Sequence, residues 1–342
     1  MKNYPNKIPS LEFMRVIAMI AIIIIHTGLF TDTLIINGNA WLANIANQLS
    51  RFAVPLFFLI AGFLIQPKLM TSPLLVIRKY NAPLLKVWLV WTVICLLLPT
   101  NLQNVIELGY LGERQLYWQF LLKTPLNSLL EGGLVHLWFL PALIIAVAIV
   151  GLFTHFKQLK LLLPVAIMLY LYGVLAGSYA SLTDIGSPFL TRNGPFFSLL
   201  MLTIGFEIRR FEVKLSAQAA LLLLCIGLLG HFLEAYWLFT KGVPFSGHDL
   251  LLFTPLWASG LFLYLLAKPK MGDHPLTYWL SKSILPIYLC HLSIAIIFFN
   301  IVGIFALSGV SRDALLFFGT TICSVAFVKL IEKTPLQNIL FR

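Results

Sequence analysis

The sequence predicts an all-α protein that crosses a membrane several times, and three observations carry that prediction. Of its 342 residues, 59% are hydrophobic and 11% are charged, and the mean hydropathy is +0.91. Soluble domains contain roughly 25% charged residues. Apolar stretches of membrane-spanning length recur along the chain, and lysine and arginine gather in alternate loops. The composition excludes a water-soluble globular fold, and also a disordered chain, which needs low hydrophobicity together with high net charge.

A helix needs about 20 apolar residues to cross roughly 30 Å of hydrocarbon. Ten stretches of this chain approach or exceed that length, the sixth being short. They are residues 10–30, 41–66, 80–99, 136–154, 160–178, 195–208, 216–239, 249–267, 276–304 and 313–331. The first is no cleavable signal peptide, because it is too long, lacks a small-residue cleavage site and contains Arg15 and His26. We therefore expect about ten transmembrane helices in one domain, residues 1–342.

The basic residues predict the orientation, because lysine and arginine are retained on the cytoplasmic side. With the N-terminus inside, eighteen of the 24 basic residues lie on or near the cytoplasmic face and five lie in outer loops. Arg51 remains, within the membrane. We expect an N-in, C-in topology, and the net charge of +11 reflects this bias rather than nucleic-acid binding.

The cysteines predict neither a zinc site nor a disulfide, because all four lie inside apolar runs without C-x-x-C spacing. We expect Cys95, Cys225, Cys290 and Cys323 to be small core residues. The sequence contains no G-x-S-x-G elbow, P-loop or H-E-x-x-H motif, so the common soluble catalytic templates do not apply. We expect no bound metal and no bound cofactor.

The longest extramembrane stretch, residues 100–135, mixes acidic and basic side chains with aromatic ones. This mixture fits an interfacial helix on the outer leaflet, serving as a lid or platform over a lipid-linked or polymeric substrate. The alternative is a plain connecting loop.

Ionisable groups in hydrocarbon are costly and are therefore candidates for function. Arg15 and His26 are eleven residues apart, which places them within about 20° of one helix face and roughly 16 Å apart along it. Glu12 lies one turn before Arg15 and can pair with it. The arginine would hold the phosphates of an acyl-CoA entering from the cytoplasm, and a pantetheine arm on the order of 15–20 Å long would bring the thioester to the histidine. The alternative is a snorkelling arginine and a hydrogen-bonded core histidine.

Arg51 precedes Pro55 in the second stretch, and proline disfavours helix before it. We expect the helix to break between these residues and to line a cavity beside a buried cation. The alternative is an arginine pinned for structure by a carboxylate, with Glu234 or Glu12 as its partner.

His136 and Trp138 open the fourth stretch at the outer face, where tryptophan is expected as an interfacial anchor. The depth of His136 is similar to that of His26, so the two rings can share one outward cavity.

The seventh stretch places His231 and Glu234 on one face, where the carboxylate can orient an imidazole or bind a sugar hydroxyl. In the ninth, Tyr288 and His291 follow Pro286, which we expect to kink the helix. A satisfied core residue is the alternative for each. We expect the remaining histidines to be solvated in loops: His155, His248 and His274.

Four motifs in order resemble the acyltransferase 3 family of integral membrane O-acyltransferases. They are residues 10–15 followed, after ten intervening residues, by His26, the Ser-Arg-x-x-Val-Pro-x-Phe-Phe-x-x-x-Gly run of 50–62, His136-Leu-Trp-Phe-Leu, and Tyr288-Leu-x-His291. The resemblance covers essentially the whole chain. Two positions differ from the family pattern, because Glu12 stands where Asp is frequent and Ala61 where Ser is frequent, which removes any hydroxyl role there.

The resemblance implies a bacterial inner-membrane, multi-pass O-acetyltransferase, similar to the compact members that O-acetylate surface polysaccharides such as the enterobacterial common antigen. Acetyl-CoA or another acyl-CoA would be the donor substrate. A sugar hydroxyl of a glycan, or of its polyprenyl-linked precursor, would be the acceptor, with membrane lipids as surroundings and no nucleic acid.

Roles follow for the nine candidate residues. His26 would be the base or acyl carrier, Arg51 would stabilise the oxyanion, and Glu12 and Arg15 would hold the donor. His136, Glu234 and His291 would shape the acceptor side or hold His26 in its working tautomer. Trp138 and Tyr288 would bind substrate. The competing interpretations are a transporter of a polar solute or lipid-linked glycan, which the lack of an internal repeat disfavours, and a structural partner in glycan export.

Overall fold

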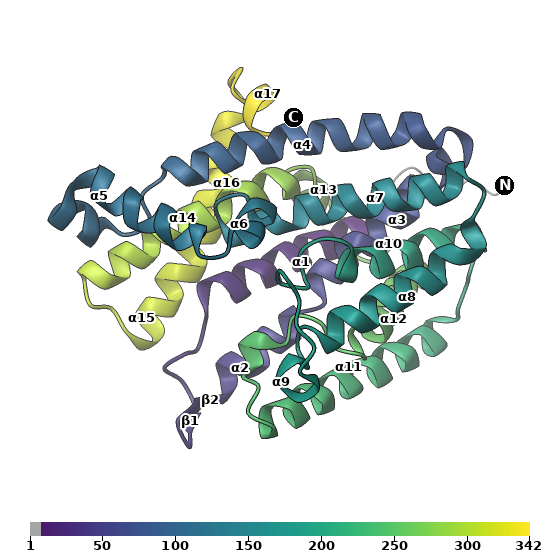
Figure 1. The fold of residues 1–342 in the computed structure, drawn as a ribbon, viewed down its shortest axis with the longest axis horizontal. Coiled ribbons are helices and arrows are strands. Elements are labelled where there is room, and N and C mark those ends of the chain that lie inside the picture. Colours follow the sequence, from purple (N-terminus) through teal and green to yellow (C-terminus); the bar gives the residue numbers. More distant parts are fainter. Residues whose placement is uncertain (1–7) are drawn as a thin grey trace. The chain divides into compact units, whose positions relative to one another are not determined.

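A computed structural model describes residues 8–342, and in that range the regular secondary structure is helical apart from one short hairpin, with loops between the helices (Figure 1). Lys2 and Lys7, which belong to the expected cytoplasmic set, lie outside the described residues. The strands are β1 (Ile35–Ile36) and β2 (Asn39–Ala40). The helices and short helical turns are α1 (Pro9–Thr27), α2 (Trp41–Ser50), α3 (Ala53–Thr71), α4 (Pro73–Leu97), α5 (Leu102–Leu122), α6 (Pro125–Glu131), η1 (Val135–Trp138), α7 (Phe139–His155), α8 (Leu159–Leu175), α9 (Ala180–Thr183), α10 (Pro195–Arg210), α11 (Ala217–Thr240), η2 (Phe245–Gly247), α12 (Thr254–Ala267), α13 (Pro275–Ser281), α14 (Ile284–Ile304), α15 (Gly309–Ala314), η3 (Leu315–Gly319), α16 (Thr320–Ile331) and α17 (Gln337–Leu340).

The all-α, polytopic fold class is confirmed. Within the described range, seven helical segments are long and apolar enough to cross a membrane, and α8 and α12 are shorter apolar helices. The predicted sixth stretch corresponds to α10, which has 16 residues. The count of ten spans and the N-in, C-in orientation stay predictions.

The chain divides into two compact units. One contains the described residues up to Ala18 with 51–82 and 141–282, and the other contains 19–50, 83–140 and 283–342. We call them the first and the second unit.

Glycines allow the closest helix contacts of the first unit. A Cβ on Gly62 of α3 would lie 2.0 Å from the Leu202 carbonyl oxygen of α10, and one on Gly205 would lie 2.0 Å from the Leu59 oxygen. Helices in a membrane associate through such small residues, because lipid tails remove the hydrophobic drive between helices. Figure 1 shows α3 and α10 side by side, as these contacts require.

The predicted break in the second stretch is confirmed. Helix α2 ends at Ser50, Arg51 and Phe52 form a turn, and α3 begins at Ala53. Proline at the third position of α3 is tolerated, because the backbone N–H groups of a first helical turn have no partner within the helix.

The predicted kink at Pro286 is wrong. The ninth stretch is two helices, α13 and α14, and Pro286 is the third residue of α14. At that position proline starts a helix rather than bending one, since it removes no hydrogen bond of the helix interior.

Two further expectations need correction. Cys95 and Cys290 are buried, but Cys225 and Cys323 are exposed, so the apolar runs do not place all four in the core. His155 and His274 are exposed as expected, whereas His248 is fully buried and its Nε2 lies 3.2 Å from the Val243 carbonyl oxygen. The turn η2 folds the 245–249 loop inward, which the sequence pattern does not reveal.

Residues 100–135 of the second unit are helical, in α5 and α6, so the plain-loop alternative is wrong. Their placement on the outer leaflet stays a prediction. Gly109 interrupts α5 with a positive φ of 74°, which glycine adopts without a steric cost. The helix thereby turns a charged pair inward, and Glu113 and Arg114 are 2% and 0% exposed.

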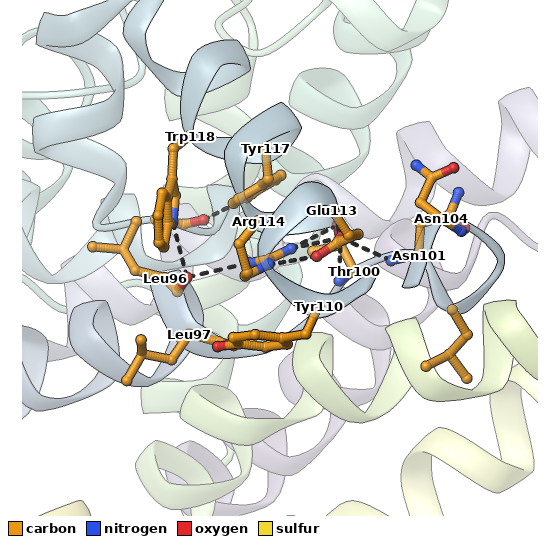
Figure 2. Close-up of polar contacts among 12 residues, drawn as sticks. Leu96, Leu97, Thr100, Asn101, Asn104, Tyr110, Glu113, Arg114, Tyr117 and Trp118 are labelled. Carbon is orange, nitrogen blue, oxygen red and sulfur yellow. Dashed lines mark hydrogen bonds and ion pairs between the residues drawn. The ribbon is translucent and has the colours of Figure 1, made fainter. Parts of the chain in front are cut away.

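Figure 2 shows how this buried pair is satisfied. One Glu113 oxygen accepts hydrogen bonds from the Thr100 amide and hydroxyl, each at 2.9 Å, and from the Arg114 guanidinium at 2.7 Å. Arg114 also donates to the carbonyl oxygen of Leu96, near the end of α4. The pair thus joins α4 to α5, because the last carbonyl groups of a helix need partners from elsewhere.

The same contacts control the protonation of Glu113. Burial raises the pKa of its carboxyl group, but the hydrogen bonds from Arg114 and Thr100 outweigh burial and lower the pKa from 4.5 to about 2. The folded protein therefore holds the carboxylate in its charged form over most of the acidic range.

We predict that Glu113→Gln lowers the free energy of unfolding by about 3–5 kcal/mol at pH 7, because it leaves Arg114 buried without its counter-ion. A depressed pKa stabilises the fold above the ordinary value and loses that effect as pH falls toward the folded value. The deficit of the variant should therefore shrink from about pH 4.5 toward pH 2 in thermal melts of detergent-solubilised protein. Exposed Glu107→Gln is the control, and an equal loss in both variants contradicts the prediction.

Candidate functional site

Three histidine rings meet in the second unit, and we call them the histidine cluster: His26, His136 and His291. They come from the last turn of α1, from η1 and from α14. The ring centroid of His291 is 5.2 Å from that of His26 and 5.2 Å from that of His136. His291 thus contacts both of the others. His136 and His291 are fully buried, whereas His26 is half-buried.

Backbone carbonyls determine which nitrogen carries the proton in two of the rings. His136 Nε2 lies 3.0 Å from the Leu289 carbonyl oxygen, and His291 Nδ1 lies 2.6 Å from the Tyr288 carbonyl oxygen. A carbonyl only accepts, so each of these nitrogens must carry the proton. In a neutral imidazole the other nitrogen then has a lone pair.

Both remaining nitrogens, His136 Nδ1 and His291 Nε2, are buried without a hydrogen-bond partner. An unpaired polar atom of this kind is costly in a protein interior and requires an explanation. A substrate hydroxyl or an ordered water would satisfy it. Among residues 8–342, no group of three histidine, cysteine or acidic side chains has the arrangement of a metal site. The chemistry that these two nitrogens fit is the acceptance of a hydrogen bond.

Tyr288 supports the cluster from α14. Its hydroxyl donates to the His136 backbone carbonyl, and its ring packs 5.5 Å from Phe139 and 5.6 Å from His291, between ring centroids. The 3-10 turn η1 directs His136 toward α14, while Trp138 of the same turn is half-buried. The Tyr288-Leu-x-His291 motif therefore positions His136 as well as His291.

The chain after His26 is tied to α15. Arg312 donates to the Gly28 carbonyl oxygen at 3.0 Å and pairs with Asp313 at 2.7 Å. The other oxygen of Asp313 accepts from the Phe30 amide at 2.9 Å. These bonds satisfy backbone groups beyond the end of α1 and hold the turn that carries His26. The sequence motifs missed this contribution, because the partners are more than 280 residues apart.

Arg51 lies in the first unit and forms an ion pair. Its guanidinium is 2.6 Å from one oxygen of Asp249, and Arg192 is 2.8 Å from the other. The carboxylate of this arginine is therefore Asp249, not Glu234 or Glu12 as the sequence suggested. The three side chains carry one net positive charge. Burial opposes ionisation of Asp249, but the two arginines outweigh it and hold the pKa of its carboxyl group below the ordinary 3.8.

Glu234, also in the first unit, accepts three hydrogen bonds. The donors are the Tyr179 hydroxyl at 2.8 Å and the backbone amides of Leu252 and Phe253 at 2.8 and 3.1 Å. These amides directly precede α12, where a carboxylate is favourable beside the positive end of the helix dipole. Glu234 thus holds the loop that carries Asp249. The nearby His231 places its Nδ1 3.1 Å from the Thr254 hydroxyl.

The predicted pair of Glu12 and Arg15 forms, at 3.0 Å, in the described part of the first unit. The structure thus places Glu12, Arg15, Arg51 and Glu234 in the first unit, and His26, His136, Trp138, Tyr288 and His291 in the second. Their catalytic and binding roles stay predictions. Asp249 and Arg192 were missed. A signal was available for Asp249, since it is an acidic residue at the start of a predicted apolar stretch.

The family of acyltransferase 3 proteins, described as an acyltransferase domain, matches residues 8–329. The chain belongs to this family. The match spans segments of both units and includes each of the nine candidate residues. The resemblance that the four motifs suggested is thereby confirmed.

Three curated relatives are racemases. The chain is 30% identical to a serine/alanine racemase of Enterococcus gallinarum over 255 residues, which are 67% of this chain and 34% of that protein. It is 28% identical to two amino-acid racemases of Enterococcus faecalis, over 57% and 79% of this chain and 27% and 39% of theirs. The matched region is thus about a third of each relative. No solved structure matches the chain.

We predict that Asp249→Asn lowers the thermal midpoint by several degrees at pH 7, because it leaves Arg51 and Arg192 facing each other without their shared carboxylate. A further Arg192→Gln change in that background should recover part of the loss by removing one positive charge. Melts of the purified variants measure both effects. Exposed Asp184→Asn is the control, and a double variant whose loss equals the sum of the single losses shows that the groups are not coupled.

Proposed function

We propose that the protein is a membrane O-acyltransferase that moves an acetyl group from cytoplasmic acetyl-CoA to a sugar hydroxyl of a surface polysaccharide or its lipid-linked precursor. Membership of the acyltransferase family supports acyl transfer. The single observation that carries the proposal is the pair of unpartnered nitrogens, His136 Nδ1 and His291 Nε2, in the histidine cluster. Two buried hydrogen-bond acceptors beside a third imidazole are suited to positioning a hydroxyl group whose proton that imidazole removes.

In the proposed reaction, His26 removes the proton from the acceptor hydroxyl as its oxygen attacks the thioester carbonyl. The C–O bond forms, the C–S bond breaks, and the proton returns from the imidazolium to the CoA thiolate. His291, whose ring contacts both others, holds the hydroxyl or a bridging water through its Nε2 lone pair. His136 and Tyr288 hold His291 and its surroundings in position.

The donor part of the proposal rests on the first unit. Arg15 is partly exposed and has Glu12 as its orienting partner, which suits a guanidinium that contacts phosphates at a membrane surface. For the proposed oxyanion role, Arg51 must donate one N–H group of its guanidinium to the substrate while another is paired with Asp249. Glu234, with three donors already bound, acts on the reaction by holding its loop.

A second candidate is a transporter of a polar solute, and the comparisons provide the observation that favours it. All three curated relatives are named for reactions of amino acids, serine and alanine among them. A membrane domain that transports an amino acid would bind it through buried polar groups, without covalent chemistry. The two candidates differ in one observable, the consumption of acyl-CoA.

We expect purified protein in liposomes to release CoA from labelled acetyl-CoA when a saccharide acceptor is present, and His26→Ala to lose this activity by about 10²–10⁴-fold, the usual contribution of a general base. His291→Ala and His136→Ala should lose less than His26→Ala, because they hold the hydroxyl rather than take its proton. The readouts are thiol release and transfer of label to the glycan. His155→Ala, at an exposed helix end, is the control.

The outcomes separate the candidates. Unchanged CoA release in His26→Ala contradicts the base assignment, while no use of acetyl-CoA by the wild type with any glycan acceptor contradicts acyl transfer to glycans. Uptake of labelled serine or alanine into protein-containing liposomes, without acetyl-CoA, would favour the transporter.

A further inference from the structure

An apolar cavity of about 460 Å³ lies within the second unit, apart from the histidine cluster. Helix α14 supplies six of its fifteen lining residues, and α4 with the segment 98–102 that follows it supplies six more. Leu134, Phe327 of α16 and Leu340 of α17 complete the wall. The volume falls in the range of protein sites that bind small molecules. None of the nine candidate site residues lines it.

The side chains that line the cavity offer too few free polar groups to hold water in it. An ordered water needs two to four polar partners. The Asn300 amide donates to the carbonyls of Thr100 and Ile296, and the Trp91 indole donates to the carbonyl of Leu340. The Thr100 hydroxyl is bound to Glu113. The Ser293 hydroxyl remains, and one hydroxyl group cannot hydrate a space of this size.

An empty cavity of this volume is unfavourable as well, because wall atoms facing a void lose their van der Waals contacts. Apolar cavities instead bind apolar molecules. The cavity therefore fits a hydrocarbon ligand.

The opening of the cavity shows where such a ligand comes from. Three lining side chains are also exposed at the protein surface: Leu98 at 40%, Leu102 at 37% and Ile297 at 56%. In a chain that crosses a membrane, large apolar side chains exposed in this way face lipid. The polar groups near these three side chains are hydrogen-bonded within the protein. The opening therefore fits a hydrocarbon chain and not a polar headgroup.

The C-terminal segment contributes Leu340 to the wall of the cavity. Lys86 of α4 donates to the Asn338 carbonyl oxygen at 2.9 Å, and the Trp91 indole donates to that of Leu340 at 2.8 Å. Both bonds hold α17 against α4, and Phe341 is buried behind it. Because these two hydrogen bonds hold the C-terminal segment in place, the cavity that it lines is a defined part of the second unit.

We propose that this cavity binds one acyl chain of a bilayer phospholipid, inserted between α4 and α14. Phospholipid is the most abundant source of hydrocarbon chains around a membrane protein. The headgroup remains outside, at the level of Leu98 and Ile297. None of its lining residues belongs to the histidine cluster, although Cys290 directly precedes His291 in α14, and the proposal does not rest on acyl transfer.

The experiment measures lipid binding to intact protein by native mass spectrometry. Delipidated protein is incubated with mixed micelles of phosphatidylethanolamine and phosphatidylglycerol of defined chains, or with undecaprenyl phosphate. Ile297→Trp obstructs the opening, and Ser293→Phe fills the interior. Ile322→Trp, equally apolar and exposed on α16 but outside the cavity, is the matched control.

We expect wild type and Ile322→Trp to retain one more phospholipid than Ile297→Trp and Ser293→Phe. Delipidation should lower the melting temperature of the wild type more than that of Ser293→Phe, whose side chain replaces the ligand. Equal phospholipid retention in all four proteins would overturn the proposal. Preferential retention of the undecaprenyl chain would also overturn it, in favour of an isoprenoid ligand. If Ser293→Phe does not fold, Ile297→Trp decides the result alone, because its side chain is already exposed.

Discussion

Hydrocarbon offers no hydrogen bonds, so every polar group that this chain places in its interior must find a partner within the protein. The described structure meets this constraint by gathering polar side chains into a few closed clusters. Glu113 and Arg114 satisfy each other and the end of α4, and Asp249 receives Arg51 and Arg192. Each cluster joins backbone segments that packing alone would not hold, because lipid removes most of the hydrophobic drive between helices.

The unpartnered nitrogens of His136 and His291 are exceptions to that rule, together with the Nδ1 atom of His248 and several buried hydroxyl groups of the described residues. Their rings are as buried as Arg114, yet each keeps one lone pair without a donor, while the other nitrogen is committed to a carbonyl. Burial without satisfaction lowers stability, and the surroundings of Tyr288 and α14 maintain it nevertheless. Structure that sustains such a cost is typical of a binding or catalytic site, and in the histidine cluster the two unpartnered nitrogens belong to rings that contact each other.

Sequence reasoning succeeded where the determinants are local. The pair of Glu12 and Arg15 is three residues apart on one helix, and the break at Arg51 follows from the proline after it. It failed where partners are distant: Asp249 is 198 residues from Arg51, and apolar periodicity does not encode such pairings. The inward turn of Glu113 and Arg114 depends on the conformation of Gly109, and the burial of His248 depends on the fold of its loop. Hydrophobicity also merged α13 with α14, because the polar junction between them, Lys282 and Ser283, is only two residues long.

The curated relatives show why the acceptor substrate has to be inferred from the side chains of the site rather than from the fold. About a third of each racemase is similar in sequence to this acyltransferase domain, so the likeness alone does not identify the chemistry. What differs between functions is the small set of polar side chains that remain available to a ligand. In the second unit the triad of imidazoles has two unpartnered nitrogens, each of which can accept a hydrogen bond from a sugar hydroxyl or from a polar solute. The consumption of a thioester is therefore the property that separates the two candidates, because a lone pair alone suits both.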